Sequence, residues 1–170
     1  MLQLSMNKEC GTNLISNRNF TYGRVDIVMK TASGSGAVTA LVLMGPSPSD
    51  EIDIEFVGKD PTNFQSMYFV KGLRIDQQAG FHSSSPSSDL SASFHTYSFE
   101  LTATAVNWYI DNSLVRSLKK SSDSTFPTAA GNFRMGVWDG SNTSGWAGTV
   151  DWSSSPKVAY IKSIKYNPYC

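Results

Sequence analysis

Short runs of alternating polar and apolar residues dominate this chain of 170 residues. No stretch of twelve or more residues places apolar side chains at the 3.6-residue spacing of a helix. Gly, Pro, Ser and Asp interrupt the alternating runs, and these residues favour turns over continued strands. The pattern therefore predicts an all-β protein.

Ten runs have the length and alternation of β-strands. They are Leu2–Met6, Tyr22–Lys30, Ala37–Met44, Glu51–Phe56, Phe64–Val70, His95–Leu101, Ala105–Ile110, Leu114–Leu118, Asn132–Trp138 and Val158–Tyr166. Asp111 and Asn112 tolerate left-handed backbone angles, so the two runs that flank them are expected to form a hairpin. A polar loop is expected over residues 83–88, and another over residues 140–148. No repeat or boundary divides the chain, so we expect a single domain over residues 1–170.

About ten short strands in one domain predict two stacked antiparallel sheets or a barrel. A large sandwich often curves, and its concave face suits an extended ligand. Lys and Arg together number 14, as do Asp and Glu, which excludes the wide basic field of a nucleic-acid binder. No run approaches the ~20 apolar residues that span a bilayer. The composition is typical of a secreted β protein with an uncharged ligand.

The acidic residues Glu51, Asp53 and Glu55 alternate with the apolar residues of one predicted strand. A strand of period two places all three carboxylates on one face, where they repel each other and raise at least one pKa. Such an arrangement suits general acid/base and nucleophilic catalysis of the cleavage of a glycosidic bond. A charged, solvated edge strand is the alternative explanation for the same pattern.

The spacing of the two glutamates constrains this chemistry. In a flat strand the Cα atoms of Glu51 and Glu55 would lie about 13 Å apart. Retaining glycosidases hold their two carboxyl groups ~5–5.5 Å apart, so the side chains must lean towards each other on a concave strand. Asp53 lies between them and is expected to separate their protonation states by bonding to one and repelling the other.

The segment from Asp50 to Gly58 resembles the active-site strand of glycoside hydrolase family 16. The resemblance covers nearly the whole chain, and the combination is most similar to the fungal Crh-type transglycosylases that join chitin to β-glucan. Its other segments are Phe20–Val25 with Lys30, Gly36–Leu43, Gln65 with Tyr68–Gly72, Phe94–Tyr97, Val137–Gly140 and Trp146–Trp152.

This resemblance implies a β-jelly-roll with the motif strand in the concave sheet. It also implies a retaining double displacement with Glu51 as nucleophile, Asp53 as helper and Glu55 as acid/base. Met67 departs from the family pattern, because relatives usually carry Asn there.

Five further residues are expected to bind substrate: Gln65, Tyr68, His95, Trp138 and Trp146. Aromatic faces suit the apolar face of a pyranose ring, and core packing is the alternative for Tyr68, Trp138 and Trp146. Structural hydrogen bonding is the alternative for His95. Trp108 lies in an alternating strand, which favours the core.

Cys10 and Cys170 are the two cysteines, and they cannot form a zinc site alone. If the protein is secreted, we expect them to lie close enough to form a disulfide; two free thiols are the alternative. No metal and no cofactor are predicted. The chain shows no signal peptide, and we expect a secreted or cell-wall protein whose signal was removed. Asn19 and Asn142 begin N-glycosylation sequons.

Three functions fit these observations. The first is a transglycosylase that acts, as a monomer, on a polysaccharide donor and an oligosaccharide acceptor. The second is a β-glucan hydrolase with the same Glu51 and Glu55. The third is a lectin-like glycan-binding module, against which the three aligned acids argue, because binding alone does not require them.

Overall fold

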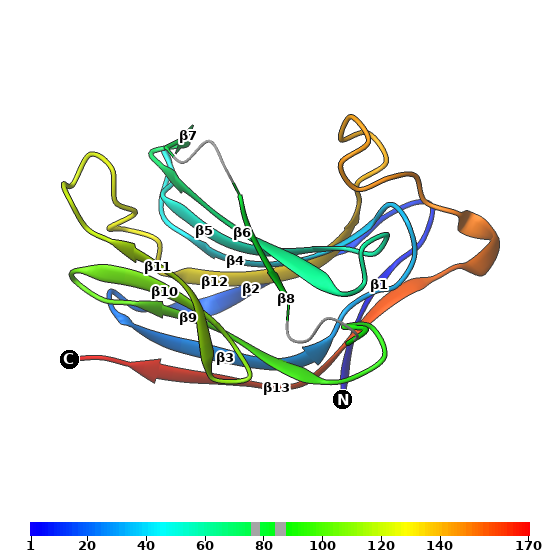
Figure 1. Ribbon diagram of the computed structural model, residues 1–170, viewed down its shortest axis with the longest axis horizontal. Coiled ribbons are helices and arrows are strands. Elements are labelled where there is room, and N and C mark those ends of the chain that lie inside the picture. Colours follow the sequence, from blue (N-terminus) through cyan, green and yellow to red (C-terminus); the bar gives the residue numbers. More distant parts are fainter. Residues whose placement is uncertain (76–78, 84–87) are drawn as a thin grey trace.

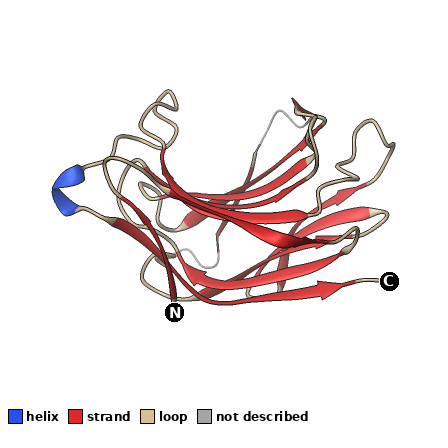
Figure 2. Cartoon of the chain, turned by 180° about the vertical axis from the view of Figure 1, so that it is seen from behind, coloured by secondary structure: helices blue, strands red, loops and turns tan. Residues whose placement is uncertain are grey.

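The computed structural model describes residues 1–75, 79–83 and 88–170. Within these ranges the regular secondary structure is β-strand, apart from one short 3-10 helix, η1 (Trp152–Ser154), shown blue in Figure 2. The strands are β1 (Leu2–Met6), β2 (Thr12–Asn19), β3 (Gly23–Lys30), β4 (Ala37–Met44), β5 (Glu51–Val57), β6 (Asn63–Val70), β7 (Leu73–Arg74), β8 (Gly80–Ser83), β9 (His95–Leu101), β10 (Ala105–Ile110), β11 (Ser113–Lys119), β12 (Asn132–Asp139) and β13 (Lys157–Pro168). No helix in the described ranges is long and apolar enough to cross a membrane. Most of the predicted loop over residues 83–88 lies outside the described residues.

Two antiparallel sheets stack on each other (Figure 1). One sheet has the order β1-β13-β3-β9-β10-β11, and the other has the order β2-β12-β4-β5-β6-β7 with β8 beside β6. In Figure 1 the β6–β7 turn and the loop after β12 rise above the two ends of the second sheet. We call this second sheet the concave sheet and the first the outer sheet.

All ten predicted strands are present, with bounds that shift by at most two residues. The hairpin between β10 and β11 is also confirmed: Asp111 and Asn112 have φ of 47° and 65°, as a two-residue turn with left-handed angles requires. The strands β2, β7 and β8 were not predicted. β2 is polar and largely exposed at the sheet edge, and β7 is only two residues long, so neither shows a clear period of two.

The core lies between the sheets and is built from the inward side of each strand. Val25, Ile27 and Met29 of β3 are fully buried, and they alternate with partly exposed residues. Trp108 of β10 is fully buried too, which confirms its predicted place in the core. Its indole Nε1 donates a hydrogen bond of 3.1 Å to the backbone carbonyl of Asp53 in the concave sheet.

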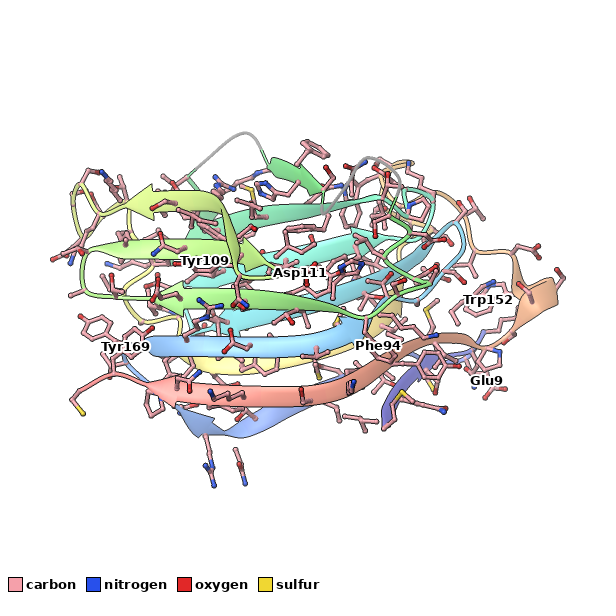
Figure 3. The ribbon with its side chains drawn as sticks, turned by 60° about the horizontal axis from the view of Figure 1, so that its bottom comes forward. Glu9, Phe94, Tyr109, Asp111, Trp152 and Tyr169 are labelled. Carbon is pink, nitrogen blue, oxygen red and sulfur yellow. The ribbon has the colours of Figure 1, made fainter. Side chains whose placement is uncertain are left out.

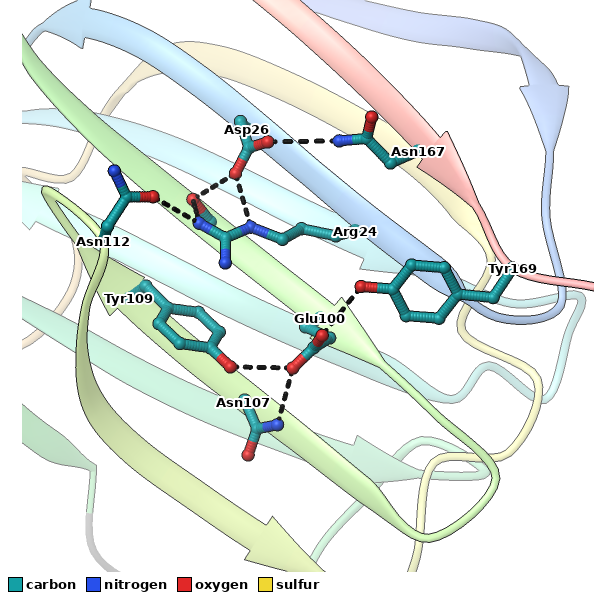
Figure 4. A network of polar contacts seen from close by, with 9 residues as sticks. Arg24, Asp26, Glu100, Asn107, Tyr109, Asn112, Asn167 and Tyr169 are labelled. Atoms are coloured by element: carbon teal, nitrogen blue, oxygen red, sulfur yellow. Dashed lines mark hydrogen bonds and ion pairs between the residues drawn. The ribbon is translucent and has the colours of Figure 1, made fainter.

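A polar network covers the outer face of the outer sheet (Figure 4). Arg24 bonds to Asp26 at 2.6 Å, and the Tyr169 hydroxyl donates to Glu100 at 2.7 Å. Because Tyr169 is one residue from the end of the chain, this contact holds the C-terminal segment against the outer sheet. Asn167 adds a bond of 3.2 Å to Asp26.

The predicted disulfide between Cys10 and Cys170 is wrong, because both cysteines are exposed and free. The first and last strands do pair, with Met6 beside Lys157. Cys10 therefore lies beyond the start of β13, whereas Cys170 follows its end. Twelve strand residues span roughly 40 Å, while a disulfide needs Cα atoms within about 7 Å. Figure 3 shows Glu9 and Tyr169 at opposite ends of the molecule.

Candidate active site

The acidic strand β5 lies in the middle of the concave sheet, between β4 and β6. Ile52, Ile54 and Phe56 are buried in the core, so the alternating acids Glu51, Asp53 and Glu55 face the other way. The prediction that the three carboxylates share one face is confirmed. The alternative of a solvated edge strand is wrong, because β5 has a neighbour on each side.

An open groove runs over the concave sheet in two adjoining parts. One part has a volume of about 640 Å³ and is lined by Asp53 and Glu55, together with residues of β6, β7, β8 and the loop after β12. The other part, of about 370 Å³, is lined by Glu51 and Glu55 together with residues of β2, β4 and β12. Glu55 and Trp138 border both parts, so the two form one continuous groove.

Strand register builds the groove floor in rows that cross the sheet. Glu55 stands opposite Ala40 on β4 and Gln65 on β6, and Asp53 stands opposite Met67. Because directly opposite residues of an antiparallel pair lie on the same face, Gln65 and Met67 share the groove with the acids. The residue that departs from the family pattern, Met67, thus contributes an apolar patch to the floor.

Asp53 is the most enclosed of the three acids, with 4% of its surface exposed. Burial raises its pKa well above the usual range, and the charges of Glu51 and Glu55 raise it further. A side-chain hydrogen bond with Glu51 acts in the same direction, because a protonated Asp53 donates this hydrogen bond to the Glu51 carboxylate. The sequence predicts that Asp53 bonds to one of the two glutamates, and Glu51 is that partner.

Glu55 is the acid whose proton can be exchanged near neutral pH. Burial, followed by the nearby charge of Glu51, raises its pKa from 4.5 to about 7. A carboxyl group with such a pKa is protonated in a large fraction of molecules at neutral pH, and it can donate or accept a proton. The expected crowding of like charges therefore does raise pKa values in this strand.

Two stacked tryptophans form one wall of the groove. The rings of Trp138 and Trp146 have centroids 6.1 Å apart and planes inclined by 26°. They pack against Val38, Val57 and Ala147 in a small apolar cluster separate from the main core. The prediction that both tryptophans face the groove agrees with their position.

Gln65 is held in place by this wall. Its side-chain oxygen Oε1 accepts a hydrogen bond of 3.0 Å from Trp146 Nε1. Because an indole N–H can only donate, the amide oxygen must face Trp146. The amide nitrogen Nε2 has no partner among the described residues, so it can donate to a ligand in the groove.

Tyr68 and His95 do not line the groove, and their predicted placement is wrong. Tyr68 is buried in the main core, because it stands opposite the core residue Ile52. His95 lies in the outer sheet, where Nδ1 contacts Asp111 Oδ2 at 2.7 Å and Nε2 contacts Ser88 at 3.1 Å. His95 therefore has the structural hydrogen-bonding role that was the alternative to substrate binding.

Several residues that shape the site were missed from the sequence. Asp50 precedes β5 and is buried, with its two carboxylate oxygens accepting from the backbone amides of Lys71 and Ala129, each at 2.9 Å. It thereby ties two loops to the start of the strand that bears Glu51. The sequence feature that could have identified Asp50 is its position directly before the alternating strand of Glu51, Asp53 and Glu55.

Arg134 and Phe81 also line the groove. Neither follows from the sequence, because their positions depend on the pairing of β12 with β4 and of β8 with β6. Among the described residues, no group of three or more His, Cys, Asp or Glu side chains could hold a metal ion.

The fold is a sandwich of two antiparallel sheets with three acids in an open groove. The sequence model of "Glycosyl hydrolases family 16" matches residues 1–154, and the chain belongs to this family. The chain is 35% identical to the Crh-like protein CRH11 of Candida albicans over 178 residues, which covers 99% of the chain and 38% of that relative. It is 33% identical to a beta-glucanase of Paenibacillus polymyxa over 165 residues, 93% of the chain and 64% of that relative.

The solved structure of a Crh5 transglycosylase in complex with NAG superposes with a TM-score of 0.88. It is 29% identical, and the match covers 98% of the chain and 72% of that structure. This likeness confirms the predicted jelly-roll sandwich of two antiparallel sheets. The chain spans less than two thirds of the length of the curated relatives named here, at 38% and 64%.

Proposed function

We propose that this chain is a retaining transglycosylase that cleaves a cell-wall polysaccharide and transfers the released chain to another glycan. The donor is chitin or β-glucan, and the acceptor is β-glucan or a chito-oligosaccharide. The observation that carries the proposal is the pair of Glu51 and Glu55 on one face of β5, with the pKa of Glu55 raised to about 7. One carboxylate and one proton-bearing carboxyl are what a retaining displacement needs.

In the first step, a carboxylate oxygen of Glu51 attacks the anomeric carbon of the donor. The bond to the leaving sugar breaks, and Glu55 gives its proton to the leaving oxygen. The product is a glycosyl ester on Glu51 and an ionised Glu55. Asp53 donates its hydrogen bond to Glu51, which orients the attacking carboxylate and limits the charge on the strand.

In the second step, Glu55 takes a proton from an incoming hydroxyl group. The oxygen of that group forms a bond to the anomeric carbon while the ester bond to Glu51 breaks. A sugar hydroxyl gives transglycosylation and water gives hydrolysis. Both displacements invert the anomeric carbon, so the overall configuration is retained.

Three residues of the groove are assigned to sugar binding. Trp138 and Trp146 offer an apolar wall for pyranose faces, and Gln65 offers a free amide N–H. Chitin and β-glucan are uncharged, which agrees with the equal numbers of acidic and basic residues in the chain. The similarity to a Crh-like protein supports these polymers and a secreted, cell-wall location.

Hydrolysis of β-glucan is the second candidate function. It is favoured by the 33% identity to a beta-glucanase over 93% of the chain. Both activities use the same two displacements, and they differ in how well a sugar acceptor competes with water.

A product assay distinguishes the candidates. The protein is incubated with a chitin oligosaccharide donor and a labelled β-glucan oligosaccharide acceptor, and the products are separated by mass. We expect a chimeric product, which Glu51→Gln abolishes and the exposed control Glu9→Gln does not. Free reducing ends without chimeric product would assign the chain to hydrolysis. Binding without any turnover would instead indicate a lectin-like module.

A further inference from the structure

The two parts of the groove differ in which catalytic carboxylates they contact. The part beside β2, β4 and β12 is lined by Glu51 and Glu55. The part beside β6, β7 and β8 is lined by Glu55 and Asp53, and Glu51 does not reach it. The proposed chemistry assigns different tasks to these residues. The difference in lining therefore distinguishes a donor part of the groove from an acceptor part.

The donor sugar of the intermediate is bonded to Glu51, so it must occupy the part that Glu51 lines. The acceptor loses its proton to Glu55, which borders both parts. The acceptor therefore binds in the part that contains Glu55 and lacks Glu51. This assignment places the incoming sugar over β6 and β8, beside Gln65.

Phe81 is the unusual residue of this acceptor part. It lies on the short strand β8, directly opposite Gln65, and lines the groove although 68% of its surface is exposed. An exposed phenylalanine gains nothing from the core, and an aromatic face is a suitable platform for the apolar side of a sugar ring. Gln65 therefore stands beside Phe81 on the neighbouring strand and accepts a hydrogen bond from Trp146.

We infer that Phe81 is the platform on which the acceptor sugar stacks, and that it sets the balance between transfer and hydrolysis. The inference rests on the proposed function. The sugar lies against the Phe81 ring, while the free amide nitrogen of Gln65 donates to one of its hydroxyl groups. Binding the acceptor there holds its reacting hydroxyl near Glu55 and displaces the water that would otherwise attack. Water needs no platform, so the loss of Phe81 penalises transfer more than hydrolysis.

The test compares Phe81→Ala and Phe81→Trp with wild type and with Leu73→Ala. Leu73 is a matched control, because it is also 68% exposed, lies on the neighbouring strand β7 and is absent from the groove lining. A chitin oligosaccharide donor is supplied with increasing concentrations of a labelled laminari-oligosaccharide, and the ratio of transferred to hydrolysed donor is measured. Both products come from one glycosyl-enzyme, so changes in folding or donor binding cancel in this ratio.

We expect Phe81→Ala to lower the ratio about threefold to tenfold at subsaturating acceptor, the effect of losing one aromatic contact. Phe81→Trp should keep or raise the ratio, and Leu73→Ala should leave it at the wild-type value. An unchanged ratio in Phe81→Ala, or an equal decrease in Leu73→Ala, overturns the inference.

A binding measurement separates this inference from the proposed function. Acceptor binding is followed by the fluorescence of the groove tryptophans, which requires no turnover. Weaker binding by Phe81→Ala than by Leu73→Ala supports the platform even if the wild-type protein turns over no donor, in which case the proposed function alone fails. Equal binding by all four proteins overturns the platform.

Discussion

Trp108 of the outer sheet holds the backbone of Asp53 in the concave sheet through an indole hydrogen bond of 3.1 Å that crosses the core. The ring is fully buried and lies behind the strand whose front face carries the three acids. The position of the acidic strand therefore depends on packing between the two sheets as well as on pairing within its own sheet.

Trp108→Phe removes this hydrogen bond and leaves a gap in the core. We expect the free energy of unfolding to fall by about 2 to 4 kcal/mol, because apolar volume is lost from the core and the buried carbonyl of Asp53 loses a hydrogen-bond donor. Urea denaturation measures the change, and Trp152→Phe, a change of the same type at a partly buried position, is the control. A decrease no larger than that of the control contradicts a special role for the contact.

Asp50 anchors two loops at the start of β5 through its two carboxylate oxygens. Asp50→Ala leaves the amides of Lys71 and Ala129 without their charged acceptor, and we expect a loss of about 2 to 4 kcal/mol in unfolding free energy. Asp89→Ala is the control, because Asp89 also accepts from a backbone amide, that of Ser91, but is exposed. Equal losses in the two variants would show that the buried anchor contributes nothing extra.

Much of the fold was predictable because its strands alternate clearly. Strands such as β3 and β10 alternate buried and partly exposed residues, and burial of one side produces this period of two. The same rule predicted the shared face of Glu51, Asp53 and Glu55. The residues that sequence patterns misplaced lie where alternation carries no information about which side faces the groove.

Tyr68 illustrates this limit. It is next to the groove residue Met67 in the sequence, but a shift of one residue moves a side chain to the other face of the sheet. The positions of His95 and Cys10 in the fold depend on which strands pair and in which order. The local sequence pattern does not predict that order. Phe81 belongs to a four-residue strand whose partner is known only from the folded chain.

The raised pKa of Glu55 predicts how stability depends on pH. A carboxyl group whose pKa is about 7 in the folded protein and near 4.5 in the unfolded chain holds its proton more tightly when folded. This tighter proton binding contributes fully to the free energy of unfolding below about pH 4.5, and the contribution is lost as the pH rises through 7. Glu55→Gln removes this dependence and should be more stable than wild type at pH 8 by up to about 3 kcal/mol.

Urea denaturation at pH 4.5 and at pH 8 checks this expectation. Glu9→Gln, at an exposed position, corrects for the loss of one negative charge. If Glu55→Gln and Glu9→Gln change stability equally at both pH values, Glu55 does not titrate as proposed.

Azide rescue distinguishes the roles of the two glutamates. Glu55→Gln should still form the glycosyl-enzyme from a nitrophenyl glycoside, because that leaving group needs little protonation. Azide needs no general base, so it should restore turnover and give the β-glycosyl azide. Glu51→Gln forms no glycosyl-enzyme, and Glu51→Gly leaves room for azide to attack the donor directly, which inverts the anomeric carbon to the α-glycosyl azide. The anomeric configuration is determined by NMR. An α-product from the Glu55 variant would show that Glu55 is the nucleophile and Glu51 the acid/base.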